Sequence, residues 1–239
     1  PVRAQHLPMM FDPLYMMVMV VGLLLSGLAS FWTKSSFRKW SQVPIGRGLT
    51  GAQVAAAILR AENISDVQIE EVGGFLSDHY DPRSRTLRLS PDVFHGRSVS
   101  SAGVAAHEVG HALQHAQGYA PMRIRQAMVP VAGIGTNLGV WLVVIGMMVG
   151  ISGLAYVGVA LFGAFVAFTL VTLPVEFDAS IRARKVLESQ RLLDGPELKG
   201  VSTVLTAAAT TYLASAVSAL LQLGYWLVRL GVLGGSRRD

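Results

Sequence analysis

Long uncharged stretches alternate with charged ones along this chain, and the alternation predicts membrane-spanning helices. The uncharged stretches are residues 14–32, 126–149, 153–175 and 200–228. Each is long enough to cross a bilayer as a helix, which takes roughly 20 apolar residues. The whole of 126–175 is uncharged, which is too long for one span, so we expect two spans joined by a tight turn at 150–153. The pattern therefore predicts four transmembrane helices.

Small residues recur at four-residue spacing in the second predicted span. Gly135 and Gly139 form one such pair, and Gly146 and Gly150 form another. Small residues at this spacing allow the backbones of two membrane helices to approach closely. We therefore expect this span to pack tightly against a neighbouring helix.

The charged stretches predict the orientation in the membrane. Residues 33–125 and 176–199 fall on one side of a four-span protein, whereas the leader 1–13 and the tail 229–239 fall on the other. Sixteen of the 20 Lys and Arg residues lie in the first two segments, and basic residues collect on the cytoplasmic side of membrane proteins. We therefore predict a multi-pass protein of the plasma membrane with extracytoplasmic termini and two cytoplasmic segments.

The larger charged segment carries the patterns of a small α+β domain. Thr50 can cap a helix that follows it, and residues 67–72 alternate between apolar and polar positions as a strand does. Residues 75–89 predict a hairpin that turns at Asp81-Pro82. Residues 100–117 are rich in alanine and predict a second helix. For that helix we expect a cap at Ser100 or Ser101 and an end at Gly118.

Two histidines in this second helix form a candidate metal site. His107 and His111 lie four residues apart, so both imidazoles can reach one point. The chain has no cysteine, so histidines and carboxylates must hold any zinc. Glu108 lies beside His107 and can act as a general base toward a bound water. This is the helical HExxH motif of zinc peptidases. We therefore predict one Zn²⁺ per chain, held by a cytoplasmic α+β zincin-like metallopeptidase domain of a mainly α integral membrane protein.

A catalytic zinc takes a third protein ligand and keeps one position open for water. Glu176 suits this role because it follows Pro174 at the end of the third span, where we expect it to open a new helix. Asp194 is a rival ligand, although its surroundings favour a turn that ends a helix. His115 continues the four-residue series, but three such histidines cannot converge on one ion.

Other polar residues are candidates for stabilising the transition state or binding the substrate. His79 and Tyr80 of the hairpin, and Arg182 or Arg184 of the segment after Glu176, can reach an oxyanion above the metal. A peptide can add to an exposed edge strand, and a strand in which leucines alternate with polar residues is a candidate edge. The residues of that strand are Thr86, Leu87, Arg88 and Leu89. An ordinary sheet strand is the alternative interpretation.

Three segments, residues 77–94, 104–121 and 173–180, resemble the YugP-type family of bacterial membrane zinc metallopeptidases. The resemblance extends over nearly the whole chain. It implies three zinc ligands and one catalytic acid/base, namely His107, His111, Glu176 and Glu108.

A more distant similarity is to the membrane CAAX-processing and HtpX-like peptidases, in which a Glu-x-x-Ala-Asp element follows the HExxH motif. Ser180 stands here in the place of that aspartate. A carboxylate that orients a zinc-bound histidine must then come from elsewhere, and Asp178 and Asp81 are candidates.

The composition limits the expected partners. Charged residues make up 15% of the chain and the net charge is +5, but the basic residues flank apolar segments, which favours the lipid bilayer over nucleic acid. We expect a peptide or membrane-protein substrate, and a membrane regulatory partner or a second copy of the chain. The alternative is a membrane scaffold or regulator with a structural or partner-gated zinc site. A zinc transporter is excluded, because the predicted spans contain no His, Asp or Glu.

Overall fold

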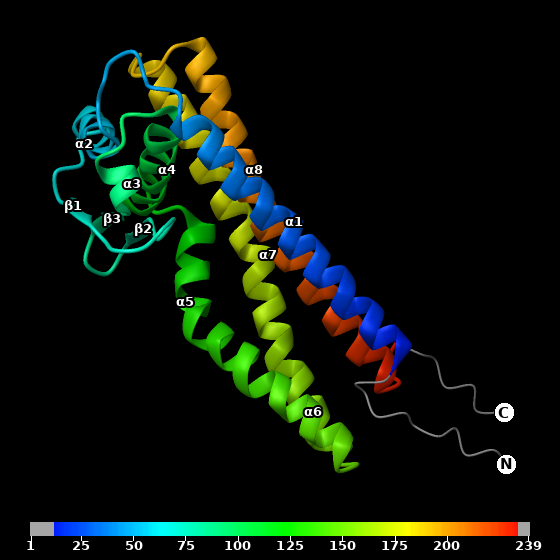
Figure 1. The fold of residues 1–239 in the computed structure, drawn as a ribbon. Helices are drawn as coiled ribbons and strands as arrows, with labels where there is room; N and C mark the ends of the chain where they lie inside the picture. Colours follow the sequence, from blue (N-terminus) through cyan, green and yellow to red (C-terminus); the bar gives the residue numbers. More distant parts are fainter. Residues whose placement is uncertain (1–11, 234–239) are drawn as a thin grey trace, which may run out of the picture. The chain divides into compact units, whose positions relative to one another are not determined.

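The computed structural model describes residues 12–233, so the predicted leader 1–13 and tail 229–239 lie partly outside the described residues. Most of the described chain is helical, with one small sheet, which confirms the predicted fold class (Figure 1). The elements in chain order are α1 Pro13–Ser41, α2 Gly51–Ala61, β1 Gln68–Glu71, β2 His79–Asp81, β3 Thr86–Leu89, α3 Pro91–Phe94, α4 Val99–Ala116, α5 Ala120–Ile134, the π-helical segment η2 Gly135–Gly139, α6 Val140–Met148, α7 Ser152–Ser189 and α8 Gly195–Arg229.

Four helical stretches within residues 12–233 are long and apolar enough to cross a membrane. They are Pro13–Ser41, Ala120–Met148, Ser152–Ser189 and Gly195–Arg229. These stretches match the four predicted spans, although the second ends at Met148, one residue before the predicted end. Gly150 lies between the second and third stretches with a φ of +74°, a conformation that glycine adopts without a steric penalty, so the predicted turn is confirmed.

Contacts divide the chain into two compact units, each with its own apolar core. The helical unit comprises the described parts of Pro1–Leu28, Ile124–Thr172 and Tyr212–Asp239. The mixed unit comprises Ala29–Arg123 and Leu173–Thr211.

Glycines in the helical unit bring two helix backbones into contact. A Cβ atom on Gly135 would lie 2.4 Å from the carbonyl oxygen of Leu161, and one on Gly146 would lie 2.5 Å from the amide nitrogen of Ala155. Side-chain carbons do not approach backbone atoms so closely, so only glycine fits at these positions. The tight packing predicted from the glycine spacing is therefore confirmed, with α7 as the neighbouring helix.

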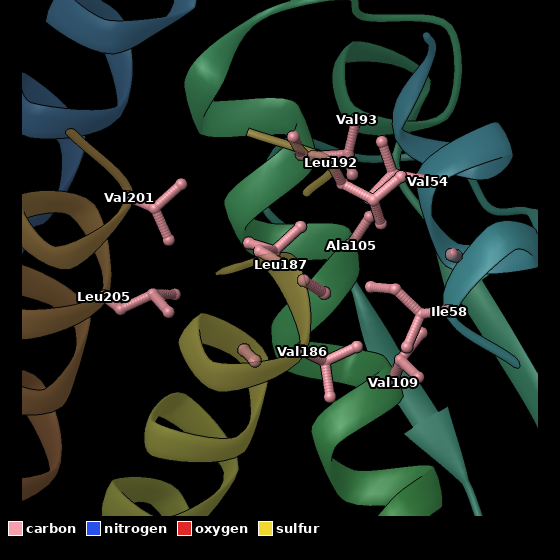
Figure 2. Packing of buried hydrophobic residues seen from close by; sticks show 14 of the residues in the cluster. Val54, Ile58, Val93, Ala105, Val109, Val186, Leu187, Leu192, Val201 and Leu205 are labelled. Carbon is pink, nitrogen blue, oxygen red and sulfur yellow. The ribbon is translucent and has the colours of Figure 1, made fainter. Parts of the chain in front are cut away.

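The mixed unit has one continuous apolar core shared by helices and sheet (Figure 2). α2 begins at the predicted cap, where the Thr50 hydroxyl accepts a hydrogen bond from the Gln53 amide (3.2 Å) and the Gln53 side chain accepts one from the Thr50 amide (2.9 Å). The core side chains come from helices and from the strands β2 and β3, and those labelled in Figure 2 are Val54, Ile58, Val93, Ala105, Val109, Val186, Leu187, Leu192, Val201 and Leu205. This core fixes α4 and the C-terminal part of α7 side by side.

The strand Thr86–Leu89 is the centre of the sheet, whose order is β1-β3-β2. β3 is parallel to β1 and antiparallel to β2, so both of its edges are already paired. The prediction that this strand is an open edge for a peptide is therefore wrong. Its charged residue, Arg88, forms ion pairs with Glu70 of β1 (3.4 Å) and Asp81 of β2 (3.1 Å). The alternation of leucine with polar residues thus reflects a central strand whose charge is balanced by its neighbours.

Candidate metal centre

The helix that carries the histidine pair is α4. Its cap is Ser98, whose hydroxyl accepts a hydrogen bond from the Ser101 amide (3.2 Å), so the predicted cap at Ser100 or Ser101 is wrong. Ser100 and Ser101 already belong to the first turn, where both are buried. The helix ends at Ala116, and Gly118 follows it with a φ of +63°, in agreement with the predicted end.

A glycine inside the motif brings α4 against α7. A Cβ atom on Gly110 would lie 2.5 Å from the carbonyl oxygen of Ala179, so a larger residue would push the two helices apart. Ala179 is fully buried, one helical turn beyond Glu176. The close approach places the Glu176 side chain next to the histidines of α4. The prediction that Glu176 opens a new helix is wrong, because Glu176 lies inside the continuous helix α7. Pro174 also lies inside this helix and does not end it.

Three side chains meet at this helix contact. Their ligand atoms, on His107, His111 and Glu176, all lie within 4.8 Å of one another. The Nε2 atoms of His107 and His111 are 3.2 and 3.5 Å from the same carboxylate oxygen of Glu176. His111 and Glu176 are buried, and the His107 side chain is 13% exposed. The cluster is therefore enclosed, with limited access at His107.

The opposite ring nitrogens are held by hydrogen bonds. His107 Nδ1 lies 3.2 Å from the Ser180 hydroxyl, and His111 Nδ1 lies 3.0 Å from the side-chain oxygen of Gln114. The Gln114 side chain is fully buried. Because its amide oxygen can only accept, it selects the tautomer of His111 with the proton on Nδ1, which leaves Nε2 free to bind a metal.

Gln114 also ties α4 to α7. Its amide nitrogen donates to the Val175 carbonyl (2.7 Å) and to the Asp178 carboxylate (2.8 Å). Asp178 therefore acts on His111 through Gln114 and does not contact the ring directly. Sequence reasoning missed Gln114, although its position three residues after His111 on the same helix face was a usable signal.

The electrostatics of the cluster match a cation site. Burial alone would raise the pKa of Glu176, but hydrogen bonds and positive charge from the two histidines outweigh it and hold the pKa well below its ordinary value. Burial alone would lower the pKa of His111, yet the hydrogen bond and charge of Glu176 raise it. A buried carboxylate thus retains its charge because cationic partners face it, and a metal ion can take over that role.

The residues present fit Zn²⁺. Ligand atoms bound to a tetrahedral zinc at about 2.0–2.1 Å lie about 3.3–3.4 Å apart, and two of the separations here are 3.2 and 3.5 Å. Two imidazoles and one carboxylate also make up a common catalytic ligand set for zinc. Within the described residues this is the one group of at least three histidine, cysteine or acidic side chains arranged for a metal.

Glu108 lies on α4 beside the cluster and is 8% exposed. Its charge acts on Asp78, which directly precedes β2 and which sequence reasoning missed. The Asp78 carboxylate accepts hydrogen bonds from the Ser90 amide (2.7 Å) and hydroxyl (3.0 Å). The pKa of Asp78 is raised, because burial and the charge of Glu108 outweigh these hydrogen bonds. The end of the hairpin therefore lies on the Glu108 side of α4.

The two candidates in the hairpin, His79 and Tyr80, form hydrogen bonds outside the cluster. His79 is exposed, and its Nδ1 lies 2.8 Å from the Ser77 carbonyl. The Tyr80 hydroxyl is 2.8 Å from Nδ1 of His115, so these two residues partner each other. Burial, followed by the charge of Asp81, raises the pKa of Tyr80 to about 12. The hydrogen bonds of these two side chains go to Ser77 and His115, and not to the histidines of the cluster.

The remaining candidates have structural roles. Arg182 donates to Asp178 and to Gln117 and lies over the Tyr119 ring, 5.6 Å from its centre, at the C-terminal end of α4. Arg184 is exposed. Asp194 caps the start of α8 through reciprocal hydrogen bonds with Glu197 (2.8 and 3.1 Å). The prediction that it belongs to a turn that ends a helix is therefore wrong.

Asp81 belongs to the hairpin turn and accepts from the Arg83 amide (2.9 Å) and the Ser84 hydroxyl (2.8 Å). These hydrogen bonds give the Asp81 carboxylate its partners within the hairpin, so it does not need the histidines as partners. Of the two proposed substitutes for the missing aspartate, only Asp178 therefore reaches a ligand, and it does so through Gln114. Ser180 itself occupies the position beside His107.

Comparison with known proteins agrees with this chemistry. A family model described as "Putative neutral zinc metallopeptidase" matches residues 15–231. The "Putative membrane protease YugP" of Bacillus subtilis (strain 168) is 43% identical over 210 residues, which cover 88% of this chain and 93% of the relative. No solved structure matches the chain significantly.

Proposed function

We propose that this chain, which belongs to the neutral zinc metallopeptidase family, is an integral-membrane endopeptidase that hydrolyses peptide bonds at the His107–His111–Glu176 centre. The observation that carries the proposal is the convergence of these three ligand atoms within 4.8 Å, on two helices held together at Gly110. Family membership alone would not say which carboxylate completes the centre.

Each residue of the centre has a distinct role in this proposal. A bound Zn²⁺ would polarise the scissile carbonyl and lower the pKa of a water molecule. His107, His111 and Glu176 would hold the metal. Glu108 would accept the proton of the attacking water and pass it to the leaving amine. Gln114 would keep His111 in the metal-binding tautomer, and Ser180 would orient the ring of His107.

The substrate would be an extended peptide at the membrane surface. β2 is an edge strand of the sheet, since its partner in the described residues is β3 alone. It follows directly after Asp78, on the Glu108 side of α4. A peptide that pairs with the free edge of β2 would therefore run past the general base. The distribution of Lys and Arg supports a cytoplasmic location for the centre, so the tails and loops of membrane proteins are the expected substrates.

The test is the substitution Glu108→Gln in the full-length protein in detergent. We expect the variant to retain its zinc, measured by elemental analysis, and to lose at least about 100-fold in the rate of cleavage of a membrane-protein substrate, because an amide cannot accept the water proton. Glu197→Gln, which changes a glutamate of the α8 cap, is the matched control and should cleave like the wild type. Cleavage that survives in Glu108→Gln would favour the alternative, a scaffold or regulator with a structural zinc.

A further inference from the structure

A cavity of about 610 Å³ opens at the C-terminal end of α1, formed by residues other than the candidate zinc ligands. Phe37 and Phe75 provide an apolar wall, and their rings meet edge to face with centres 5.6 Å apart. The floor contains the buried hydroxyls of Ser98 and Ser101, which lie 2.8 Å apart. The cavity therefore has an apolar wall of aromatic rings and a polar floor of hydroxyl groups.

Two arginines line the cavity without a protein partner. Arg38 comes from α1 and Arg97 from the segment before α4, and both are exposed. In the part of the chain that the structure describes, neither guanidinium forms an ion pair or hydrogen bond with another residue. Asp92 also lines the cavity and is the acidic residue in its lining. The lining therefore carries a net positive charge, with a single carboxylate beside the two guanidinium groups.

If the hydrocarbon core ends with the first predicted span at Trp32, the cavity is expected at the outer boundary of the lipid headgroup layer. Phe37 and Arg38 follow Trp32, the last residue of the first predicted span, by five and six residues of the same helix. At about 1.5 Å per residue this is about 8–9 Å along the helix axis. The headgroup layer on each side of the hydrocarbon core is about 5–8 Å thick. A phospholipid in the leaflet where α1 ends can therefore reach the cavity with its headgroup.

We propose that this cavity binds the headgroup of an anionic phospholipid of the phosphatidylglycerol type. Arg38 and Arg97 hold the phosphodiester, because guanidinium groups bind phosphate oxygens in a bidentate manner. Asp92 accepts hydrogen bonds from the free hydroxyls of the headgroup. Its negative charge repels additional phosphates and so disfavours binding of headgroups that carry them. Phe37 and Phe75 contact the glycerol backbone. The site is independent of the peptide chemistry at the zinc centre.

The experiment measures lipid retention by the full-length protein with native mass spectrometry, after reconstitution in mixed phosphatidylcholine and phosphatidylglycerol. A second mixture replaces phosphatidylcholine with phosphatidylethanolamine. We expect the wild type to retain phosphatidylglycerol in preference to either zwitterionic lipid. The double variant Arg38→Ala/Arg97→Ala should lower that preference by about tenfold or more. The matched control is Lys34→Ala/Lys39→Ala, which removes the same charge from exposed positions of α1 outside the cavity lining and should keep the preference.

Each other outcome would overturn the proposal. An equal loss in both double variants would mean that diffuse surface charge attracts the lipid and that no site exists. Equal retention of phosphatidylethanolamine would contradict the selection for an anionic headgroup. Displacement of the lipid by free glycerol phosphate would make the cavity a site for soluble phosphate esters. Zinc content measured on the same samples should equal that of the wild type, which separates this result from any failure of the zinc centre.

Discussion

Two carboxylates of the mixed unit have lowered pKa values in opposite surroundings. Glu176 is buried, and burial opposes its charge, so the two histidines must outweigh a desolvation penalty. The Asp81 side chain is 28% exposed at a hairpin turn. Hydrogen bonds from the Ser84 hydroxyl and the Arg83 amide hold the pKa of Asp81 at about 2. Both groups are ionised at neutral pH, but only Glu176 depends on cationic partners to be so.

The difference shows what each site can tolerate. Water can replace a lost partner at Asp81, because the turn is open to solvent. No water can readily do so at Glu176, where a lost partner leaves a buried charge without compensation. Substitutions at the candidate metal centre should therefore lower zinc affinity strongly. Substitutions at the hairpin turn should change the free energy of unfolding only slightly. Four substitutions test this comparison.

The largest effect is expected for Glu176→Ala. The variant loses one of three protein ligands, so zinc affinity should fall by more than the 10–100-fold typical of residues that only orient a ligand. The measurement is the zinc content of detergent-purified protein, expected near one per chain in the wild type and largely lost in the variant. Added zinc should also cease to raise the melting temperature. Asp194→Ala, at the rival position, is the control and should keep its zinc. Zinc retained in Glu176→Ala would remove this residue from the centre.

An intermediate effect is expected for Gln114→Leu. Leucine has a similar size but cannot accept the proton of His111 Nδ1, so the zinc dissociation constant should rise about 10–100-fold. Ser180→Ala should have a smaller effect, because His107 is the more exposed histidine and water can replace the hydroxyl. A chelator competition assay gives both constants. The melting temperature of the metal-free proteins distinguishes a positioning role from a loss of packing. Equal constants for Gln114→Leu and the wild type would mean that His111 is oriented by other contacts.

The smallest effect is expected for Asp81→Asn. The pKa of Asp81 in the folded protein, about 2, lies below the ordinary value of 3.8. Its contribution to stability is therefore fully present above pH 3.8 and is lost as the pH falls toward 2. At neutral pH the variant should be less stable by at most about 1 kcal/mol, the range of exposed ion pairs. Denaturant unfolding at pH 7 and pH 3 measures the gap, which should narrow at the lower pH. A stability difference between variant and wild type that grows on acidification would contradict a lowered pKa for Asp81.

Much of the site could be predicted from local patterns. The spacing of His107 and His111 on one helix face requires only helical periodicity, and Glu176 was favoured by its place after the third span. Asp178 was proposed as a substitute for the missing aspartate, and its route to His111 through Gln114 was not foreseen. Sequence alone places Gln114 on the same helix but cannot show that a residue of α7 lies within 3 Å of it. Such contacts depend on how two helices far apart in sequence pack.

The amino-acid sequence by itself determined the four apolar stretches, the turn at Gly150, the hairpin and the zinc-binding motif, because each depends on the hydropathy or backbone preferences of neighbouring residues. The tertiary structure alone decided that β3 lies at the centre of the sheet, that α7 continues through Pro174, and that Ser180 and Gln114 face the histidines. These features depend on the pairing of strands and on the approach of α4 to α7 at Gly110, where the absence of a side chain allows Glu176 to reach both histidines.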